Sequence, residues 1–461
     1  MNPSFDRFWR IASMALLAGF VAACGGGGGG GGDEDGSGGT PPDLRPVTDV
    51  FANPATAGAN VGWVAPNAGT PTGYSISASA DGMPTITQQV AAGSTSTSLT
   101  GLMPDMTYTI RVAAQYGSDS VSSAQPAVVH VPSLTNTPAQ IAAYERAAAY
   151  SASLDGDAVL VMRDGQVVFE RYADDYVSTD PHPLASGTKS FSCALMLAAE
   201  QDGLINREQR VADVITEWAG DPNKSRTTVR QLLSLQGGLS TNPDYSALDV
   251  QNQDTYQLAI DDPAAYAPGD AFIYDPLAFQ AFALMFERRS SNTDPVMYLR
   301  RKVFTPIGLT GDLWQRDAQM HPQMAGGAMM TAAAWARYGQ LMLQQGTWGG
   351  SRLLPASGVQ DCLRYDNPAY RGYGITWWLN RNVGSSYDPS IDQIPPDGRA
   401  GSSGQIAPRA PEDMVMAAGT GRQRLYLLPS QRLVVVRLAP LATQFDDWSD
   451  DEFLARLLGN G

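Results

Sequence analysis

One apolar stretch constrains the fold of this chain more than any other feature: residues 191–199 (FSCALMLAA) contain no charged residue, glycine or proline. Such a segment must be buried, and it predicts a helix that continues to the stop signal at Asp202-Gly203. Directly before it lie residues 186–189 (SGTK), which place a serine three residues ahead of a lysine. Positions i and i+3 share one face of a helix, so we expect the Ser186 hydroxyl and the Lys189 ammonium to lie within reach of each other.

This pair of residue types suits acyl transfer. A serine hydroxyl is a weak nucleophile until a base takes its proton, and a desolvated lysine can have a pKa low enough to help. The amino end of a helix adds free N–H groups, which suit a developing oxyanion. The spacing also arises by chance, but the only other lysines are Lys224 and Lys302, and a buried lysine is costly without a partner or a function. We therefore interpret Ser186 as a candidate nucleophile.

The composition limits the partners of the chain. It has 461 residues and a net charge of −15, with no basic run, which argues against nucleic acid as a partner. Three cysteines are too few and too widely spaced for a disulfide framework or a zinc site, although a bridge between Cys193 and Cys362 stays open. No metal and no cofactor is expected. We interpret all three histidines as structural: His130, His182 and His321.

Residues 1–24 are typical of an export signal, because two arginines precede an apolar stretch too short to span a bilayer. The stretch ends in VAAC, which resembles a bacterial lipobox, and the resemblance implies lipidation of Cys24. The glycine run that follows cannot fold and suits a flexible tether, which we place at residues 25–45. We expect an exported protein anchored by lipid to the bacterial cell envelope, with glycine at position 26 favouring the outer membrane. The alternative is an ordinary secretory signal.

Residues 46–132 change to short strands with period-two apolar alternation, such as 61–64 and 107–112. Strands at this spacing predict a β-sandwich. Residues 99–108 (LTGLMPDMTY) resemble the tyrosine corner of a fibronectin type III domain, and Trp63 falls where that family keeps a core tryptophan. The resemblance implies no chemistry. We expect a spacer, with contact to a protein or glycan as the other option.

Residues 133–137 form a linker, and residues 138–461 form the last domain. It contains one hairpin near its start, which turns at Asp164-Gly165, and another near its end, which turns at 429–431. Two hairpins at the ends of a helical middle predict one antiparallel sheet built from both ends of the domain.

Two helical features complete this prediction. Residues 205–340 are expected to form a mainly helical lobe beside the sheet. A terminal helix is expected to begin near Ser449, where Ser449 and Glu452 have the spacing of a capping box.

Five stretches of residues 138–461 occur in an order that a known family shares: 186–189 (SGTK), 228–239 (TVRQLLSLQGGL), 268–274 (PGDAFIY), 325–343 and 417–421 (AAGTG). The domain resembles the serine hydrolase family that includes class C β-lactamases, D,D-peptidases and related esterases and amidases. The resemblance implies an α/β (α+β) domain, with an antiparallel sheet flanked by helices and a mainly helical lobe. It also implies hydrolysis through an acyl-enzyme without a cofactor.

The resemblance assigns roles to single residues. Ser186 is implied as nucleophile, with Lys189 and Tyr274 managing its proton, and Tyr266 is the fallback for the tyrosine. Backbone N–H groups are implied to hold the oxyanion. They belong to Ser186, Gly419, Thr420 and Gly421.

Two departures from the family pattern bear on the substrate. The tyrosine motif often reads Y-x-N, but here Tyr274 is followed by Asp275 and Pro276, and proline has no side-chain donor. The third motif carries a lysine or histidine in β-lactamases and peptidases, but here it reads either AAG at 417–419 or GTG at 419–421, and no lysine or histidine follows His321. A carboxylate anchor is therefore missing unless Arg422 or Arg424 replaces it.

These departures favour a small-molecule ester or amide as substrate. The alternatives are a β-lactamase or D,D-peptidase acting on cell-wall-type substrates, and a catalytically inert protein that binds through its fibronectin-like module. Three aromatic residues are candidates either for an acyl pocket or for the core: Tyr373, Trp377 and Trp378.

Overall fold

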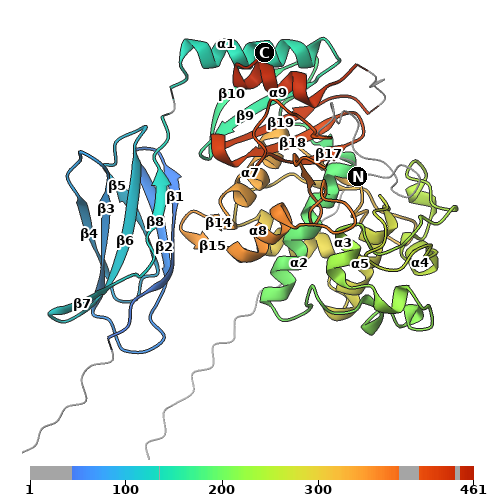
Figure 1. The fold of residues 1–461 in the computed structure, drawn as a ribbon, viewed down its shortest axis with the longest axis horizontal. Coiled ribbons are helices and arrows are strands. Elements are labelled where there is room, and N and C mark those ends of the chain that lie inside the picture. Colours follow the sequence, from blue (N-terminus) through green and yellow to red (C-terminus); the bar gives the residue numbers. More distant parts are fainter. Residues whose placement is uncertain (1–43, 134, 384–403, 442–446) are drawn as a thin grey trace, which may run out of the picture. The chain divides into compact units, whose positions relative to one another are not determined.

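The computed structural model describes residues 44–133, 135–383, 404–441 and 447–461 (Figure 1). The predicted signal at 1–24, its Cys24 and residues 25–43 of the predicted tether lie outside the described residues. Within the described ranges, no helix is both long and apolar enough to cross a membrane.

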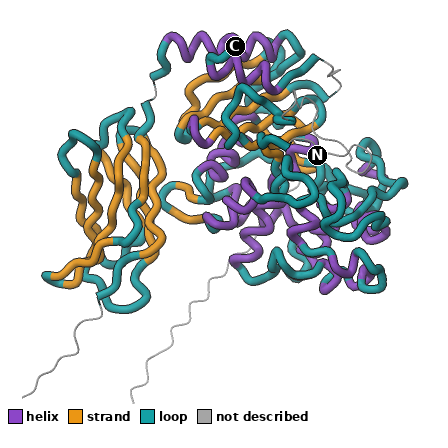
Figure 2. Tube along the Cα trace, viewed as in Figure 1, coloured by secondary structure: helices purple, strands orange, loops and turns teal. Residues whose placement is uncertain are grey.

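Residues 48–130 form two antiparallel sheets, as the alternating pattern predicts (Figure 2). One sheet has the order β1-β2-β5, and the other has the order β4-β3-β6-β7, with β8 also pairing with β6. The inward side chains of both sheets form one apolar core. The strands are β1 (Thr48–Ala55), β2 (Gly58–Val64), β3 (Gly73–Ser79), β4 (Ile86–Ala91), β5 (Ser96–Thr100), β6 (Thr107–Tyr116), β7 (Asp119–Ser122) and β8 (Ala127–His130).

The two signature residues of this sandwich occupy the expected places. Trp63 is buried, and its ring centroid lies 5.1 Å from that of Tyr74 on the facing sheet. Tyr108 is also buried, and its hydroxyl accepts a hydrogen bond from the Met103 N–H at 3.0 Å. This bond fixes the corner before β6, so the tyrosine corner is confirmed.

A six-stranded antiparallel sheet organises the rest of the chain, in the order β10-β9-β19-β18-β17-β16. The amino-terminal hairpin therefore pairs with the carboxy-terminal hairpin through β9 and β19, as predicted. The strands are β9 (Ala158–Arg163), β10 (Gln166–Tyr172), β16 (Trp378–Leu379), β17 (Val415–Gly419), β18 (Gln423–Leu428) and β19 (Leu433–Leu438).

Helices cover both faces of this sheet (Figure 1). The alternation along β18 shows which helix covers which face: Leu425 and Leu427 pack on Gly339 of α7 (Ala332–Leu343), whereas Tyr426 stacks on Phe453 of α9 (Asp450–Leu458). Helix α1 (Pro138–Ala152) packs beside α9. The Ser449 side chain accepts from the Glu452 N–H at 3.2 Å, which confirms the predicted start of the terminal helix.

The remaining helices and loops form the second lobe. The predicted range 205–340 is wrong at its end, because α7 packs against β9, β18 and β19 and so belongs to the sheet. The lobe and its connections contain α2 (Phe191–Gln201), α3 (Val229–Leu233), α4 (Thr255–Asp261), α5 (Leu277–Arg289), α6 (Pro295–Leu299) and α8 (Ala356–Arg364), the small sheet β11 (His182–Pro183), β13 (Ala328–Met330) and β12 (Leu313–Trp314), and the hairpin β14 (Thr347–Trp348) and β15 (Ser351–Arg352).

Candidate active site

The candidate nucleophile lies on a tight turn before the buried helix. Residues Ala185–Ser190 form a 3₁₀ turn, and α2 begins only at Phe191. The reason is local: the hydroxyls of Thr188 and Ser190 donate to the carbonyl oxygens of Ala185 and Gly187, at 2.6 and 2.7 Å. Such bonds to the residue three positions back favour the tighter helix. The pair therefore lies on a 3₁₀ turn and not on an α-helix, but the spacing of three residues still brings the serine and the lysine together.

Lys189 lies beneath Ser186. Its side chain is only 2% exposed, and Nζ donates to Ser186 Oγ at 2.9 Å and to the Ala325 carbonyl oxygen at 2.7 Å. Burial lowers the pKa of Lys189 to about 7, although the Asp275 carboxylate opposes the shift. A lysine in this state can accept a proton from the hydroxyl beside it near neutral pH.

Tyr274 completes the group. Its hydroxyl is hydrogen-bonded to Ser186, and the Lys189 Nζ lies 4.9 Å from the centroid of its ring. Burial raises the pKa of Tyr274 to about 12, even though the Ser186 hydrogen bond and the charge of Arg424 act in the opposite direction. The phenol therefore stays protonated near neutral pH. The structure thus brings together the three residues predicted as catalytic; the fallback, Tyr266, is not needed.

The carboxy end of β17 lies against the nucleophile turn. A Cβ on Gly419 would stand 2.1 Å from the Leu184 carbonyl oxygen, so only glycine allows the strand to approach this closely. Thr420, Gly421 and Arg422 form the turn into β18, since Gly419 pairs with Gln423. Gly419 is therefore adjacent to the turn that carries Ser186, where the resemblance implies the oxyanion site.

Neither reading of the third motif supplies a cation, because its first residue is Ala417 in one and Gly419 in the other. Ala417 lies two residues before Gly419 and hence on the same face of β17. Arg424 cannot replace the cation, because it is opposite Ala418 in the sheet, is 2% exposed and forms an ion pair with Asp450 of α9 at 2.8 Å. The hypothesis for Arg424 is therefore wrong. Arg422 is buried in the turn, with a φ of +58°.

The three candidate aromatic residues divide between site and core. Trp378 stacks on Tyr274, with ring centroids 5.5 Å apart, and Tyr373 packs edge-on against Tyr274 at 6.5 Å. Trp377 is fully buried and stacks on Tyr338 of α7. Trp378 and Tyr373 therefore hold the tyrosine ring in place, whereas Trp377 belongs to the core.

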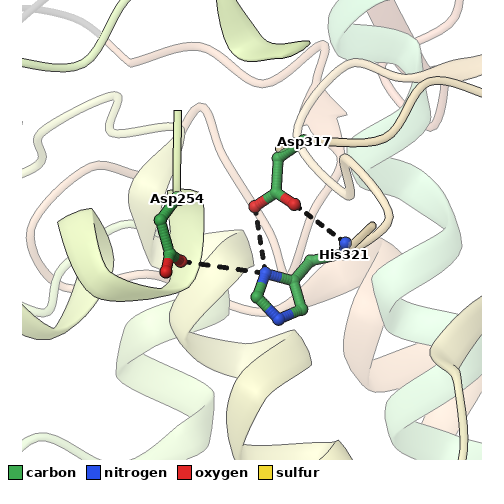
Figure 3. Close-up of side chains that lie close together, drawn as sticks. All are labelled: Asp254, Asp317 and His321. Carbon is green, nitrogen blue, oxygen red and sulfur yellow. Dashed lines mark hydrogen bonds and ion pairs between the residues drawn. The ribbon is translucent and has the colours of Figure 1, made fainter. Parts of the chain in front are cut away.

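The histidines lie in structural networks. His321 stacks on Tyr256. Its Nδ1 lies 3.0 Å from a carboxylate oxygen of Asp317 and 3.8 Å from one of Asp254; Figure 3 shows these three side chains. This group resembles a cation site, but Asp317 already accepts hydrogen bonds from the Thr255 and His321 N–H groups and from the Thr255 hydroxyl. These bonds fasten the loop after β12 to the start of α4. The other two histidines bond Thr107 (His130), and Pro183 and Asp157 (His182).

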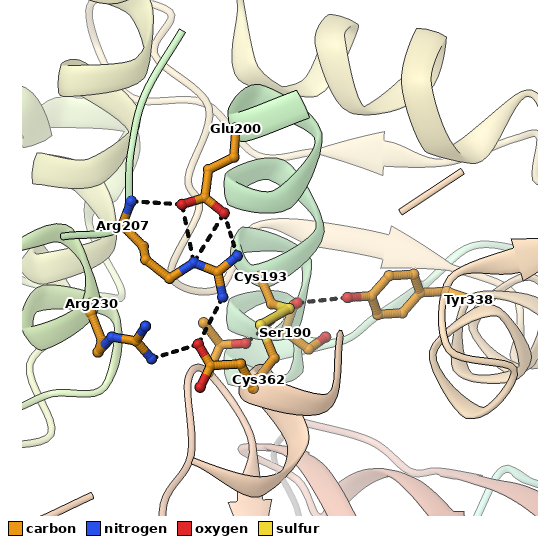
Figure 4. Close-up of a disulfide and its surroundings, with 9 residues drawn as sticks. Ser190, Cys193, Glu200, Arg207, Arg230, Tyr338 and Cys362 are labelled. Carbon is orange, nitrogen blue, oxygen red and sulfur yellow. Dashed lines mark hydrogen bonds and ion pairs between the residues drawn. A yellow bond between two sulfur atoms is a disulfide. The ribbon is translucent and has the colours of Figure 1, made fainter. Parts of the chain in front are cut away.

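The sequence left open a bond that anchors the nucleophile helix. Cys193 of α2 and Cys362 of α8 form a disulfide, with Cα atoms 6.4 Å apart (Figure 4). Beside it, Arg207 joins Glu200 to Asp361, and Tyr338 donates to the Ser190 carbonyl oxygen at 2.6 Å. The sequence left the pairing open, and only the fold shows that the two cysteines meet.

Sequence reasoning missed the role of Asp275, the residue after the candidate tyrosine. Asp275 is 1% exposed and faces Lys189 closely enough to raise its pKa against the effect of burial. Its position next to Tyr274 was the signal, but the comparison with Y-x-N directed attention to Pro276 instead.

An antiparallel sheet with helices on both faces, beside a lobe that carries a serine–lysine pair and a tyrosine, defines a β-lactamase-fold hydrolase. Residues 141–459 match the family model of beta-lactamases, and residues 45–129 match that of fibronectin type III domains. The first match covers more than half of the chain, which therefore belongs to the beta-lactamase family. The resemblance proposed from the sequence is confirmed for both segments.

Known relatives differ in what they act on. The 6-aminohexanoate-dimer hydrolase of Paenarthrobacter ureafaciens is 28% identical over 228 residues, which are 45% of this chain and 57% of that protein. The chain thus matches little more than half of this relative's length. A family VIII carboxylesterase (16% identity, 70% and 97% of the two chains, TM-score 0.53) and a class C β-lactamase from Rhodobacter sphaeroides (16%, 70% and 99%, TM-score 0.50) share the fold.

Proposed function

We propose that this chain is an exported serine hydrolase, anchored to the bacterial cell envelope through a lipidated Cys24, that cleaves an ester or amide through an acyl-enzyme. The observation that carries the catalytic part is the 2.9 Å contact between the Nζ of the buried Lys189 and the Oγ of Ser186, a residue that is only half-buried. A serine hydroxyl on a half-buried residue that is hydrogen-bonded to a desolvated amine has the geometry of an activated nucleophile.

In the first half-reaction, Ser186 Oγ attacks the substrate carbonyl carbon while Lys189 accepts the hydroxyl proton. The carbonyl electron pair moves to oxygen, and N–H groups of Ser186 and of residues 419–421 hold the oxyanion. When the pair returns, the bond to the leaving group breaks, and the proton passes from Lys189 through the Tyr274 hydroxyl to the leaving oxygen or nitrogen. Water then attacks the acyl-enzyme with the same groups as base, and Ser186 regains its proton.

Lys189 is the resting base in this scheme. Its pKa of about 7 lets the neutral amine exist at physiological pH, whereas the pKa of Tyr274, about 12, keeps the phenol protonated. Tyr274 bonds Ser186 and lies beside Lys189, so it can relay a proton without first losing one. Lys189 thus accepts the proton of Ser186, and Tyr274 passes it to the leaving group.

The substrate side of the proposal rests on the missing cation of the third motif. Alanine or glycine at that position gives no anchor for a substrate carboxylate, which favours esters and amides that lack one over penicillin-like or D-alanine-terminated substrates. The names of two similar proteins, a 6-aminohexanoate-dimer hydrolase and a carboxylesterase, support an amide or an ester as the bond that is cleaved. Covalent labelling by a fluorescent penicillin would favour the β-lactamase or D,D-peptidase alternative instead.

Two features support export. The disulfide between Cys193 and Cys362 belongs in an oxidising compartment such as the periplasm. The fibronectin type III domain stands between the predicted anchor and the hydrolase domain, which suits a spacer.

The test is intact-mass detection of an adduct after the full-length chain is treated with a fluorophosphonate. We expect one adduct on the wild type and none on Ser186→Ala. Ser192→Ala is the matched control, because Ser192 is a buried serine one turn and a half further along, and it should label like the wild type. Labelling of Ser186→Ala would mean that another serine reacts, and absence of any adduct would favour the inert binding protein.

A further inference from the structure

Two buried carboxyl groups lie in contact beside the candidate base. Asp262 is 0% exposed and Asp275 1% exposed, and their side chains lie close enough to interact directly. The loop before them explains the contact: Leu239 forms a β-bridge with Ala264, and Ser240 N–H donates to the Pro263 carbonyl oxygen at 2.9 Å. This pairing holds Asp262 against the segment that binds Asp275.

The two groups have too few donors for two negative charges. One Asp275 oxygen accepts from the Thr241 hydroxyl and from the Leu277 N–H, both at 3.0 Å, and so caps the start of α5. Among the described residues, the other Asp275 oxygen has no well-aligned N–H or O–H donor, and neither has Asp262, which only the Asn242 N–H faces. The Lys224 Nζ points to the carbonyl oxygens of Ile260 and Asp262 instead, at 2.9 and 2.8 Å. Two buried carboxyl groups in this state must share a proton.

We propose that Asp262 carries this proton and donates it to Asp275, and that the single charge left on Asp275 makes Asp275 a positioning residue that tunes Lys189. The inference deepens the proposed function and rests on it for the role of Lys189. Asp275 follows Tyr274 directly, so one short segment supplies both the proton relay and the charge that faces the base.

The electrostatics of the surrounding groups agree with this arrangement. Burial, followed by the charge of Asp275, raises the pKa of Asp262 to about 10, and Lys224 opposes the shift only weakly. The same Asp275 charge raises the pKa of Lys189 and of Tyr245, the other titratable groups that face it. A second charge on Asp262 would strengthen both effects and push the pKa of Lys189 away from neutrality.

The pH profile of hydrolysis tests the role of Asp275. We expect Asp275→Asn to move the acid limb of kcat/KM, which titrates Lys189, down by roughly one pH unit, because an opposite charge close to the lysine is lost. Asp262→Asn is the matched control: its amide N–H can replace the acid O–H, so Asp275 keeps its charge and the limb stays at the wild-type position. An unmoved limb in a folded Asp275→Asn would overturn the tuning role.

Thermal unfolding tests the shared proton without any use of activity. In the unfolded chain Asp262 loses its proton near pH 4, but in the fold it keeps it to about pH 10, so this group makes the wild type less stable as pH rises between these values. We expect the Tm of Asp262→Asn to match the wild type at pH 4 and to exceed it increasingly toward pH 9. A constant Tm difference across this range would overturn the shared proton. Because this measurement needs no substrate, its outcome stays separate from a failure of Ser186 to label.

Discussion

Replacement of Lys189 by methionine is expected to lower kcat/KM by roughly 10²–10⁴-fold, the usual contribution of a general base. Methionine has similar length and fills the same buried space, but it cannot accept the Ser186 proton across the 2.9 Å contact. The acid limb near pH 7 should disappear together with the activity, because the group that produces it is gone. Kinetics over pH 5 to 10, with the ester or amide that the wild type cleaves best, measure both effects.

The same substitution should stabilise the fold. The pKa of Lys189 is about 7 in the folded chain and near 10.5 in the unfolded chain. The unfolded chain therefore binds this proton more tightly, and the difference lowers the stability of the fold wherever the unfolded lysine is protonated. The penalty is present in full below pH 7 and fades as pH rises toward 10.5. Lys189→Met removes it, for a gain of up to roughly 4 kcal/mol below pH 7, less the cost of leaving the Ala325 carbonyl oxygen without its donor.

A loss of kcat/KM together with a gain in stability on Lys189→Met distinguishes a functional lysine from a structural one. Lys302→Met is the control, because Lys302 lies on the surface and pairs with Asp202 at 2.7 Å, and its kcat/KM should stay at the wild-type value. If Lys189→Met instead lost stability and kept its activity, Lys189 would be a core residue, and the base would have to be sought elsewhere.

The sequence predicted the parts of the site that depend on local spacing. Ser186 and Lys189 are three residues apart, and any helical turn brings such residues together, whether it is 3₁₀ or α. The strands were also predictable, since the turn at Asp164-Gly165 and the apolar runs around it are local signals. Gly419 was also predicted, because it belongs to a motif of the family. The physical requirement for glycine there is the close approach of the Leu184 carbonyl oxygen, which lies far away in sequence.

The direction of single side chains in the sheet was not predictable. A shift of one residue in strand register turns each side chain to the other face, and register is set by pairing with distant strands. Arg424 therefore could not be assigned to the site or to Asp450 before the pairing of β17 with β18 was known. For the same reason the adjacent Trp377 and Trp378 could not be divided between the core and Tyr274.

The contact between Asp262 and Asp275 needed the fold as well. It depends on a single bridge in a loop region, between Leu239 and Ala264, and such bridges leave no periodic pattern in a sequence. The composition already showed an excess of acidic residues, but most of them are on the surface, so nothing marked these two as buried.

The disulfide between Cys193 and Cys362 is expected to contribute strongly to the stability of the fold. Cys193 lies one turn after Lys189 on α2, and Cys362 holds that helix to α8 across 169 residues of sequence. The bond closes a long loop and so restricts the unfolded chain. Both cysteines are fully buried in the fold, where the bond also fixes the helix that follows Lys189. A cross-link over a loop of this length contributes about 2–5 kcal/mol in small domains.

We expect the double variant Cys193→Ala/Cys362→Ala to unfold roughly 5–10 °C below the wild type in thermal scans. Dithiothreitol should lower the wild-type Tm toward that of the variant and leave the variant unchanged, because Cys193 and Cys362 are both absent from the variant and the sequence then has a single cysteine. The double variant avoids leaving a single unpaired thiol in the domain. Equal Tm values for wild type and variant under oxidising conditions would mean that the bond does not form in solution, and export would then lose the support it takes from this bond. A large difference that dithiothreitol abolishes would show instead that the nucleophile helix depends on an oxidising compartment for its stability.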